Sequence, residues 1–221
     1  WRDRGLDTPP MSVNLSPLQF RDPALLDNVR SALTEHGIEP HQICLELTEG
    51  AVMDDVPRSE QLMRALKAIG VMLSLDDFGT GYSSLSYLQR FPFDKVKIDQ
   101  SFVRDITSST QEAVIAKVVI SMAHGLGLRV IAEGVETETQ CEFMRRNACD
   151  EIQGYFFCRP VPAAQMQALL MEDRRLAAHL VRERARTRTL LLVDDEPNVV
   201  AALRRLLRPD GYRILSAASG A

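Results

Sequence analysis

Short apolar runs alternate with longer amphipathic stretches through most of the chain. The runs predict six β-strands, at Met11–Leu15, Ile43–Thr48, Val71–Asp76, Lys95–Ile98, Arg129–Glu133 and Glu151–Phe156. Most of these strands are mainly apolar, which is typical of strands that are buried on both faces of a parallel sheet.

The segments between the strands carry the signals of helices. Asp22-Pro23 supplies an N-cap and a first-turn proline, and Gly37 ends the helix that follows. Ser59–Ile69 and Gln111–His124 show apolar stripes with helical spacing. Thr137 and Gln140 form a capping box. Repeated strand–helix units predict an α/β fold, which is either a doubly wound sheet or a barrel.

Polar side chains recur at or just past the carboxyl ends of these strands. They are Asn14, Glu46, Asp76, Asp77, Lys97, Glu133 and Gln153. An open sheet of six strands would spread them over about 24 Å, whereas a two-metal site needs its ions about 3.5–4 Å apart. In a (β/α) barrel the carboxyl ends of the strands build one active site. This chemistry favours the barrel.

The residue types suit hard divalent cations. Glu46, Asp76, Asp77 and Glu133 offer carboxylates and Asn14 offers an amide oxygen, which favours two Mg²⁺ or Mn²⁺ ions over Zn²⁺. Without cations the acids would repel one another and raise each other's pKa. Taken singly, an Asp-Asp pair is more often a strand end or a turn. A set of polar groups at successive strand ends is not explained that way.

Composition narrows the class of partner. The net charge of −4 and the pI near 5.6 argue against a broad basic surface for a nucleic-acid polymer, although metal ions would let a small anion bind. The sequence has no apolar run long enough to cross a membrane and no signal-peptide pattern. The four cysteines show no CxxC spacing and are interpreted as reduced thiols. We therefore expect a cytoplasmic protein without membrane partners.

Six ordered motifs resemble the EAL-domain family of cyclic-di-GMP phosphodiesterases. They are Ser12-Val-Asn-Leu-Ser16, Leu45-Glu-Leu-Thr-Glu49, Leu75-Asp-Asp-Phe-Gly-Thr-Gly-Tyr-Ser-Ser-Leu85, Lys97-Ile-Asp99, Ala132-Glu-Gly-Val-Glu136 and Gln153-Gly-Tyr155. The resemblance spans residues 1–171 and implies a TIM-like (β/α)8 barrel. It also implies cleavage of cyclic-di-GMP to linear pGpG and, since family members often dimerise, a homodimer.

The resemblance assigns roles to individual residues. It implies that Asn14, Glu46, Asp76 and Glu133 bind metal and that Asp77 binds a second ion. Lys97 would contact the attacking water and the phosphate, and Gln153 would hold the phosphate or the water network. Glu49 and Asp99 would position the loop that follows Asp77. Glu133 is a candidate general base, although a carboxylate committed to metal is a poor one. Glu136 either joins the site or only supports a loop.

The sequence departs from the family pattern at its start. No Glu-Ala-Leu segment, which carries another metal ligand in the family, precedes Asn14. We therefore expect a barrel that lacks its first two strands and a fragment that is unstable or inactive alone. Two alternatives remain open. One is a catalytically inactive receptor for cyclic-di-GMP, and the other is a barrel enzyme that acts on another phosphodiester.

The end of the chain changes character. Residues 172–188 are rich in arginine and predict a solvated helical linker. Leu190–Val193 predicts a buried strand that ends at Asp194-Asp195, and a helix at Val199–Leu207 and a strand at Tyr212–Ala217 follow. Residues 189–221 resemble the beginning of a flavodoxin-like receiver domain, in which such an acidic pair binds Mg²⁺. This implies a parent protein that works with a histidine kinase. A chance acidic strand end is the alternative.

Overall fold

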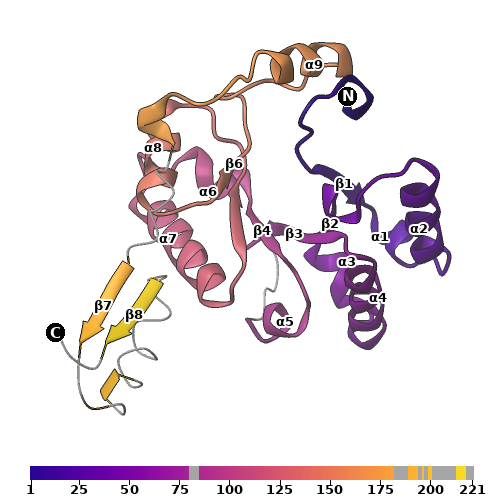
Figure 1. The fold of residues 1–221 in the computed structure, drawn as a ribbon, viewed down its shortest axis with the longest axis horizontal. Coiled ribbons are helices and arrows are strands. Elements are labelled where there is room, and N and C mark those ends of the chain that lie inside the picture. Colours follow the sequence, from indigo (N-terminus) through magenta and orange to yellow (C-terminus); the bar gives the residue numbers. More distant parts are fainter. Residues whose placement is uncertain (80–84, 182–188, 194–195, 197–198, 201–212, 218–221) are drawn as a thin grey trace. The chain divides into compact units, whose positions relative to one another are not determined.

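The computed structural model describes residues 1–79, 85–181, 189–193, 196, 199–200 and 213–217 (Figure 1). The chain divides into two compact units, Trp1–Leu180 and Val181–Ala221, and each is considered by itself.

The first unit alternates strands with helices. In chain order its elements are η1 (Arg2–Arg4), β1 (Met11–Leu15), α1 (Pro17–Phe20), α2 (Leu25–Glu35), η2 (Pro40–Gln42), β2 (Ile43–Thr48), α3 (Glu49–Met53), α4 (Val56–Ile69), β3 (Met72–Phe78), α5 (Leu85–Arg90), β4 (Lys95–Ile98), α6 (Gln100–Arg104), α7 (Thr110–Gly125), β5 (Arg129–Ala132), α8 (Glu138–Arg146), β6 (Glu151–Ile152), α9 (Ala163–Met171) and η3 (Ala178–Leu180).

The six strands form one sheet in the order β1-β2-β3-β4-β5-β6, and every pair is parallel. The prediction of a parallel α/β sheet is confirmed. Two strand ends differ from the expected ones by two residues or more, while β3 begins one residue later and β5 ends one residue earlier than predicted. β3 continues beyond Asp76 to Phe78, and β6 ends at Ile152 instead of reaching Phe156.

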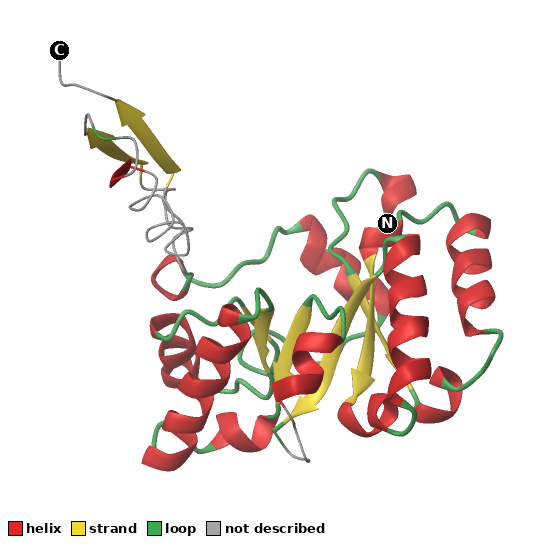
Figure 2. Ribbon diagram, turned by 90° about the horizontal axis from the view of Figure 1, so that it is seen from below, coloured by secondary structure: helices red, strands yellow, loops and turns green. Residues whose placement is uncertain are grey.

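One face of the sheet carries the apolar core. Leu47, Leu73 and Val96 are fully buried in a cluster that includes Met63 and Leu66 of α4. α3 and α4 pack against β2 and β3, and α7 packs against β4 and β5 (Figure 1). Figure 2 shows helices lying alongside the strands of the sheet. Because side chains alternate along a strand, the polar neighbours of these residues lie on the opposite face. The predicted burial on both faces holds for most of β2 to β5, although only one face is mainly apolar. It does not hold for β1, where every residue except Leu15 is exposed.

The sheet is curled. Glu46 comes from β2 and Glu133 follows β5, and in a flat sheet these two strands would lie about 14 Å apart. Both carboxylates lie 2.7 Å from the ammonium nitrogen of Lys97, so they are no further from each other than twice that distance. Only curvature brings them together, as the predicted barrel requires.

The second unit contains a two-stranded parallel sheet of β7 (Thr189–Val193) and β8 (Arg213–Ala217). The two predicted strands are therefore present. The predicted burial of the first is not observed, because Leu191 is 59% exposed and Val193 is 48% exposed. Most of the predicted helix at 199–207, and Asp194 and Asp195, lie outside the described residues.

The described part of the predicted helical linker differs from expectation. Residues 172–177 form no helix, and Ala178–Leu180 forms only a 3-10 turn. Leu180 is buried, η3 lies against α8, and Leu176 packs on the core. Because these two leucines pack against the rest of the first unit, the segment is not wholly solvated. In the part of the chain that the structure describes, no helix is both long and apolar enough to cross a membrane.

Candidate active site

A buried lysine holds three carboxylates together at the carboxyl ends of the strands. The Lys97 ammonium nitrogen lies 2.7 Å from Glu46, 2.7 Å from Glu133 and 3.1 Å from Asp76. Lys97 is 3% exposed and Glu46 is 5% exposed. An ammonium group has three N–H donors, so each carboxylate can accept one of them.

A backbone irregularity brings a fourth carboxylate to the same place. The register between β3 and β4 shifts between Leu75 and Phe78, and Asp77 adopts a left-handed conformation with φ 55°. In a regular strand Asp76 and Asp77 would point to opposite faces. A bulge redirects a side chain, and it places carboxylate oxygens of Asp76, Asp77 and Glu133 within 4.8 Å of one another.

The cluster fits divalent cations. When ionised, its four carboxylates (Glu46, Asp76, Asp77 and Glu133) carry four negative charges, and Lys97 supplies one positive charge, which leaves three uncompensated. Crowded carboxylates without a counter-charge are costly. The ligands are oxygen atoms from several strands, the type that Mg²⁺ and Mn²⁺ prefer.

The pKa values reflect this crowding. Burial raises the pKa of Glu133, and Lys97 opposes the rise without cancelling it. Burial, followed by repulsion from Asp76 and Asp99, raises the pKa of Asp77. For Lys97, burial lowers the pKa, but the hydrogen bonds to Glu133 and Glu46 outweigh it, so the net shift is upward. Lys97 therefore stays protonated and cannot act as a base.

We expect cation binding to release protons. The raised pKa values of Asp77 and Glu133 mean that their ionised forms destabilise the metal-free protein at neutral pH, and this penalty disappears as the pH falls through the folded-state values. Cations need the ionised forms, so their affinity should fall over the same window. Calorimetric titration with Mg²⁺ at a series of pH values, in buffers of different ionisation enthalpy, measures the release.

The matched control for this titration is Glu133→Gln, which has no proton to lose at that position. It should release fewer protons than the unmodified protein. Equal binding enthalpies in all buffers for the unmodified protein would contradict the expected release.

The remaining predicted residues lie at or just past the carboxyl ends of the strands. Asn14 on β1 is the register partner of Glu46. Glu49 is buried at the start of α3. Asp99 caps α6 by accepting the Ser101 N–H at 2.9 Å. Gln153 is exposed just after β6, and its backbone N–H donates to the Ala132 carbonyl at 2.8 Å.

Glu136 is exposed on the loop before α8, and the structure brings it to none of the carboxylates through a described contact. The sequence analysis did not predict the bulge at Asp77. It also did not indicate that Lys97 would be bonded to the metal-binding carboxylates themselves. Aspartate tolerates positive φ better than most residues, and this is the one sequence feature that could have indicated the left-handed conformation at Asp77.

Gly134 has a steric role beside the cluster. Its φ is 66°, and an added Cβ would lie 2.6 Å from the Gln100 Cβ. We expect Gly134→Ala to lower the free energy of unfolding by about 1–3 kcal/mol and to displace the neighbouring Glu133. Chemical denaturation and Mn²⁺ titration measure the two effects. Gly125→Ala is the control, since an added Cβ there meets nothing within 4 Å. Equal losses in both variants would contradict the steric account.

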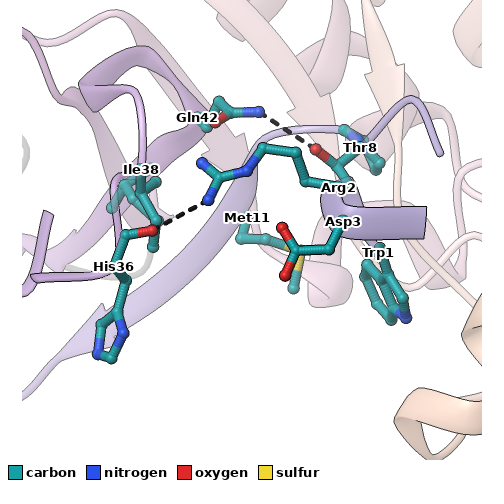
Figure 3. A pocket seen from close by; sticks show the side chains of 10 residues that line it. Trp1, Arg2, Asp3, Thr8, Met11, His36, Ile38 and Gln42 are labelled. Carbon is teal, nitrogen blue, oxygen red and sulfur yellow. Dashed lines mark hydrogen bonds between the residues drawn. The ribbon is translucent and has the colours of Figure 1, made fainter. Parts of the chain in front are cut away.

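A cavity of about 280 Å³ lies away from the cluster, at the amino ends of β1 and β2 (Figure 3). Arg2 there donates to the carbonyls of His36 and Gly37, and Gln42 donates to Thr8 at 3.1 Å. These bonds cap the end of α2 and hold the first residues of the chain. The acidic cluster lies at the opposite, carboxyl ends of the strands, so this cavity is separate from the candidate site.

Comparison with known proteins agrees with this geometry. The model of the EAL domain matches residues 1–160. The chain belongs to the EAL domain family. Its EAL region is 44% identical over 168 residues to the bifunctional diguanylate cyclase/cyclic di-GMP phosphodiesterase MucR of Pseudomonas aeruginosa, covering 76% of this chain and 24% of MucR. The chain spans about a quarter of the length of the curated relatives it matches.

Solved EAL structures share the fold. The EAL domain of Mycobacterium smegmatis DcpA superposes with a TM-score of 0.76 at 36% identity, over 80% of this chain and 79% of that one. The MucR phosphodiesterase in complex with c-di-GMP gives a TM-score of 0.69 at 44% identity, over 71% and 64%. The manganese/cy-diGMP complex of Klebsiella pneumoniae BlrP1 gives 0.64 at 35% identity, over 68% and 39%.

Proposed function

We propose that the first unit is a metal-dependent phosphodiesterase domain that hydrolyses cyclic-di-GMP to linear pGpG. The observation that carries the proposal is the meeting of Glu46, Asp76 and Glu133 on Lys97, with Asp77 turned toward them, in an EAL domain. The c-di-GMP complex of MucR and the manganese complex of BlrP1 support the substrate and the cofactor.

Two divalent cations, Mg²⁺ or Mn²⁺, would be held by Asn14, Glu46, Asp76, Asp77 and Glu133. Bound there, they lower the pKa of water and so supply the nucleophile near neutral pH. The four carboxylates fix the positions of the cations because each comes from a different, rigid strand end or from the bulge.

Lys97 contributes a fixed positive charge. In the metal-free protein it holds the carboxylates in place, so the cations meet a preformed site. In the reaction its ammonium group would donate to a phosphoryl oxygen as negative charge builds there, a type of stabilisation that is strongest in a dry site. Hydrolysis adds one water across one phosphodiester bond and leaves a terminal phosphate.

The outer residues would position the substrate. Gln153 emerges from β6 at the same end of the sheet and would bind a phosphate or the water network. After burial and Asp76, repulsion from Asp99 contributes to the raised pKa of Asp77. Asp99 and Glu49 would fix the loop that follows β3. The receptor alternative is less well supported, because all four carboxylates that such a receptor would lose are present.

Hydrolysis is tested with the purified 221-residue protein, cyclic-di-GMP and Mg²⁺ or Mn²⁺, with separation of pGpG by chromatography. We expect cation-dependent conversion that Glu46→Gln abolishes and that Asp105→Asn, on the exposed end of α6, leaves unchanged. Failure to bind or cleave cyclic-di-GMP would overturn the proposal. Conversion by this protein would also show that the expectation of an inactive chain, which the sequence suggested, is wrong.

We also propose the wider architecture that the sequence indicates. The curled sheet would supply six strands of an eight-stranded barrel. Residues 172–188 would link it to a receiver fragment at 189–221, a proposal supported by the parallel pair β7-β8. A homodimer, a histidine kinase partner for the parent protein and a cytoplasmic location belong to the same proposal.

A further inference from the structure

One buried hydroxyl lies beneath the carboxylate cluster without a partner. Ser74 on β3 is 0% exposed, and its Oγ forms no hydrogen bond among the described residues. Buried polar groups in native proteins are almost always satisfied, by protein or by ordered water. A hydroxyl in this position therefore indicates a bound water molecule.

The strand register shows what surrounds this hydroxyl. Glu46 on β2 and Lys95 on β4 are the direct register partners of Ser74. Register partners in a parallel sheet leave the same face at the same level. Ser74 thus lies between a buried carboxylate and a buried ammonium, and Glu46 and Lys95 are 5% and 7% exposed.

The described contacts of these neighbours leave suitable hydrogen-bonding capacity. Glu46 accepts the Lys97 N–H at 2.7 Å through Oε2, and a carboxylate has a second oxygen with lone pairs of its own. Lys95 contacts both oxygens of Glu151 at 2.9 Å, and its ammonium has three N–H groups. A buried water typically makes about three hydrogen bonds, and this position offers a hydroxyl, a carboxylate and an ammonium.

We propose that Ser74 is a positioning residue that holds a buried water between Lys95 and Glu46. The water accepts a hydrogen bond from Lys95 or Ser74 and donates one to the Glu46 carboxylate. Glu46 is then held by the water as well as by Lys97. Partners of metal-binding carboxylates commonly orient them in this way. The inference rests on the proposed metal site and adds a residue that touches neither cation nor substrate.

The test compares Ser74→Ala with Ser59→Ala in the whole 221-residue protein. Ser59 is also buried, at 4% exposure, but it lies on α4 and away from the inner face of the sheet. We expect Ser74→Ala to weaken Mn²⁺ binding about three- to tenfold, somewhat less than the loss typical of direct partners of metal ligands. Ser59→Ala should bind Mn²⁺ as the unmodified protein does. Calorimetry and electron paramagnetic resonance of bound Mn²⁺ give the affinities.

A high-resolution crystal structure of the unmodified, metal-free protein is the second measurement, and it does not depend on the variant folding. We expect an ordered water within hydrogen-bond distance of Ser74 Oγ and Glu46. A Ser74 hydroxyl that donates to a backbone carbonyl with no water present would overturn the inference. So would a Ser74→Ala variant with unchanged Mn²⁺ affinity. Failure of the proposed function appears differently, as a lack of cyclic-di-GMP cleavage by the unmodified protein.

Discussion

Replacing Lys97 with methionine is expected to make the stability of this protein depend on divalent cations. The variant would leave Glu46, Asp76 and Glu133 crowded together without the ammonium group that contacts all three within 3.1 Å. Removing one partner of a buried ion pair typically costs about 3–5 kcal/mol. The free energy of unfolding of the metal-free variant should fall by about that amount.

Cations should restore much of this loss, because they supply positive charge to the same carboxylates. Ligand at 100 times its dissociation constant stabilises a fold by about 2.7 kcal/mol. Thermal denaturation of Lys97→Met with and without Mg²⁺ measures the effect. Lys67→Met is the control, since Lys67 pairs with Asp94 at the other end of β3 and its loss should not be restored by Mg²⁺. A Lys97→Met variant as stable as the unmodified protein without cations would contradict the account.

Asp77→Asn should separate cation binding from stability. Neutralising Asp77 removes its repulsion with Asp76 and Asp99, and asparagine accepts a left-handed backbone readily. The metal-free variant should therefore be as stable as the unmodified protein or more stable. Its Mn²⁺ affinity should fall at least about 10-fold, the lower limit for changes one contact further from a metal, and cyclic-di-GMP cleavage should fall with it.

Calorimetric titration with Mn²⁺ measures the affinity of Asp77→Asn for the cation, and chemical denaturation measures its free energy of unfolding. Asp105→Asn is the matched control, an exposed aspartate whose described ion pair is with Arg104 at 3.4 Å. It should change neither value. If Asp77→Asn lost stability but bound Mn²⁺ normally, the bulge would have only a structural role.

The positions of the strands and the end of the sheet that carries the acids were predictable from sequence. Hydrophobic periodicity locates β1 to β5 within two residues of their observed ends. Glu46, Asp76 and Glu133 each follow or end an apolar run, so parallel pairing alone places them at one end of the sheet. That inference needs no knowledge of side-chain packing.

Distances within the site were not predictable, because they depend on the curl of the sheet and on one bulge. The contact of Lys97 with Glu46 joins β4 to β2, two strands that are separated by β3, so strand periodicity alone does not predict it. The left-handed conformation of Asp77 reflects a register shift between β3 and β4, which local sequence does not encode.

Tertiary contacts also overrode local pattern near the end of the first unit. Tyr155 and Phe156 suggested that the strand continues after Ile152. β6 stops there because the chain turns closely against Val135, where a Cβ on Gly154 would lie 2.2 Å from the Val135 carbonyl oxygen. The charged segment after α9 suggested a solvated helix. Leu176 and Leu180 instead pack against the core, and this burial outweighs helix propensity.

Anomalous diffraction from crystals grown with Mn²⁺ would locate the cations themselves. We expect manganese bound by Glu46, Asp76, Asp77 and Glu133, with a second ion about 3.5–4 Å from the first and with Lys97 displaced from at least one carboxylate. Crystals with saturating Mn²⁺ that show no anomalous peak at the cluster, and Lys97 still in contact with all three acids, would contradict this expectation.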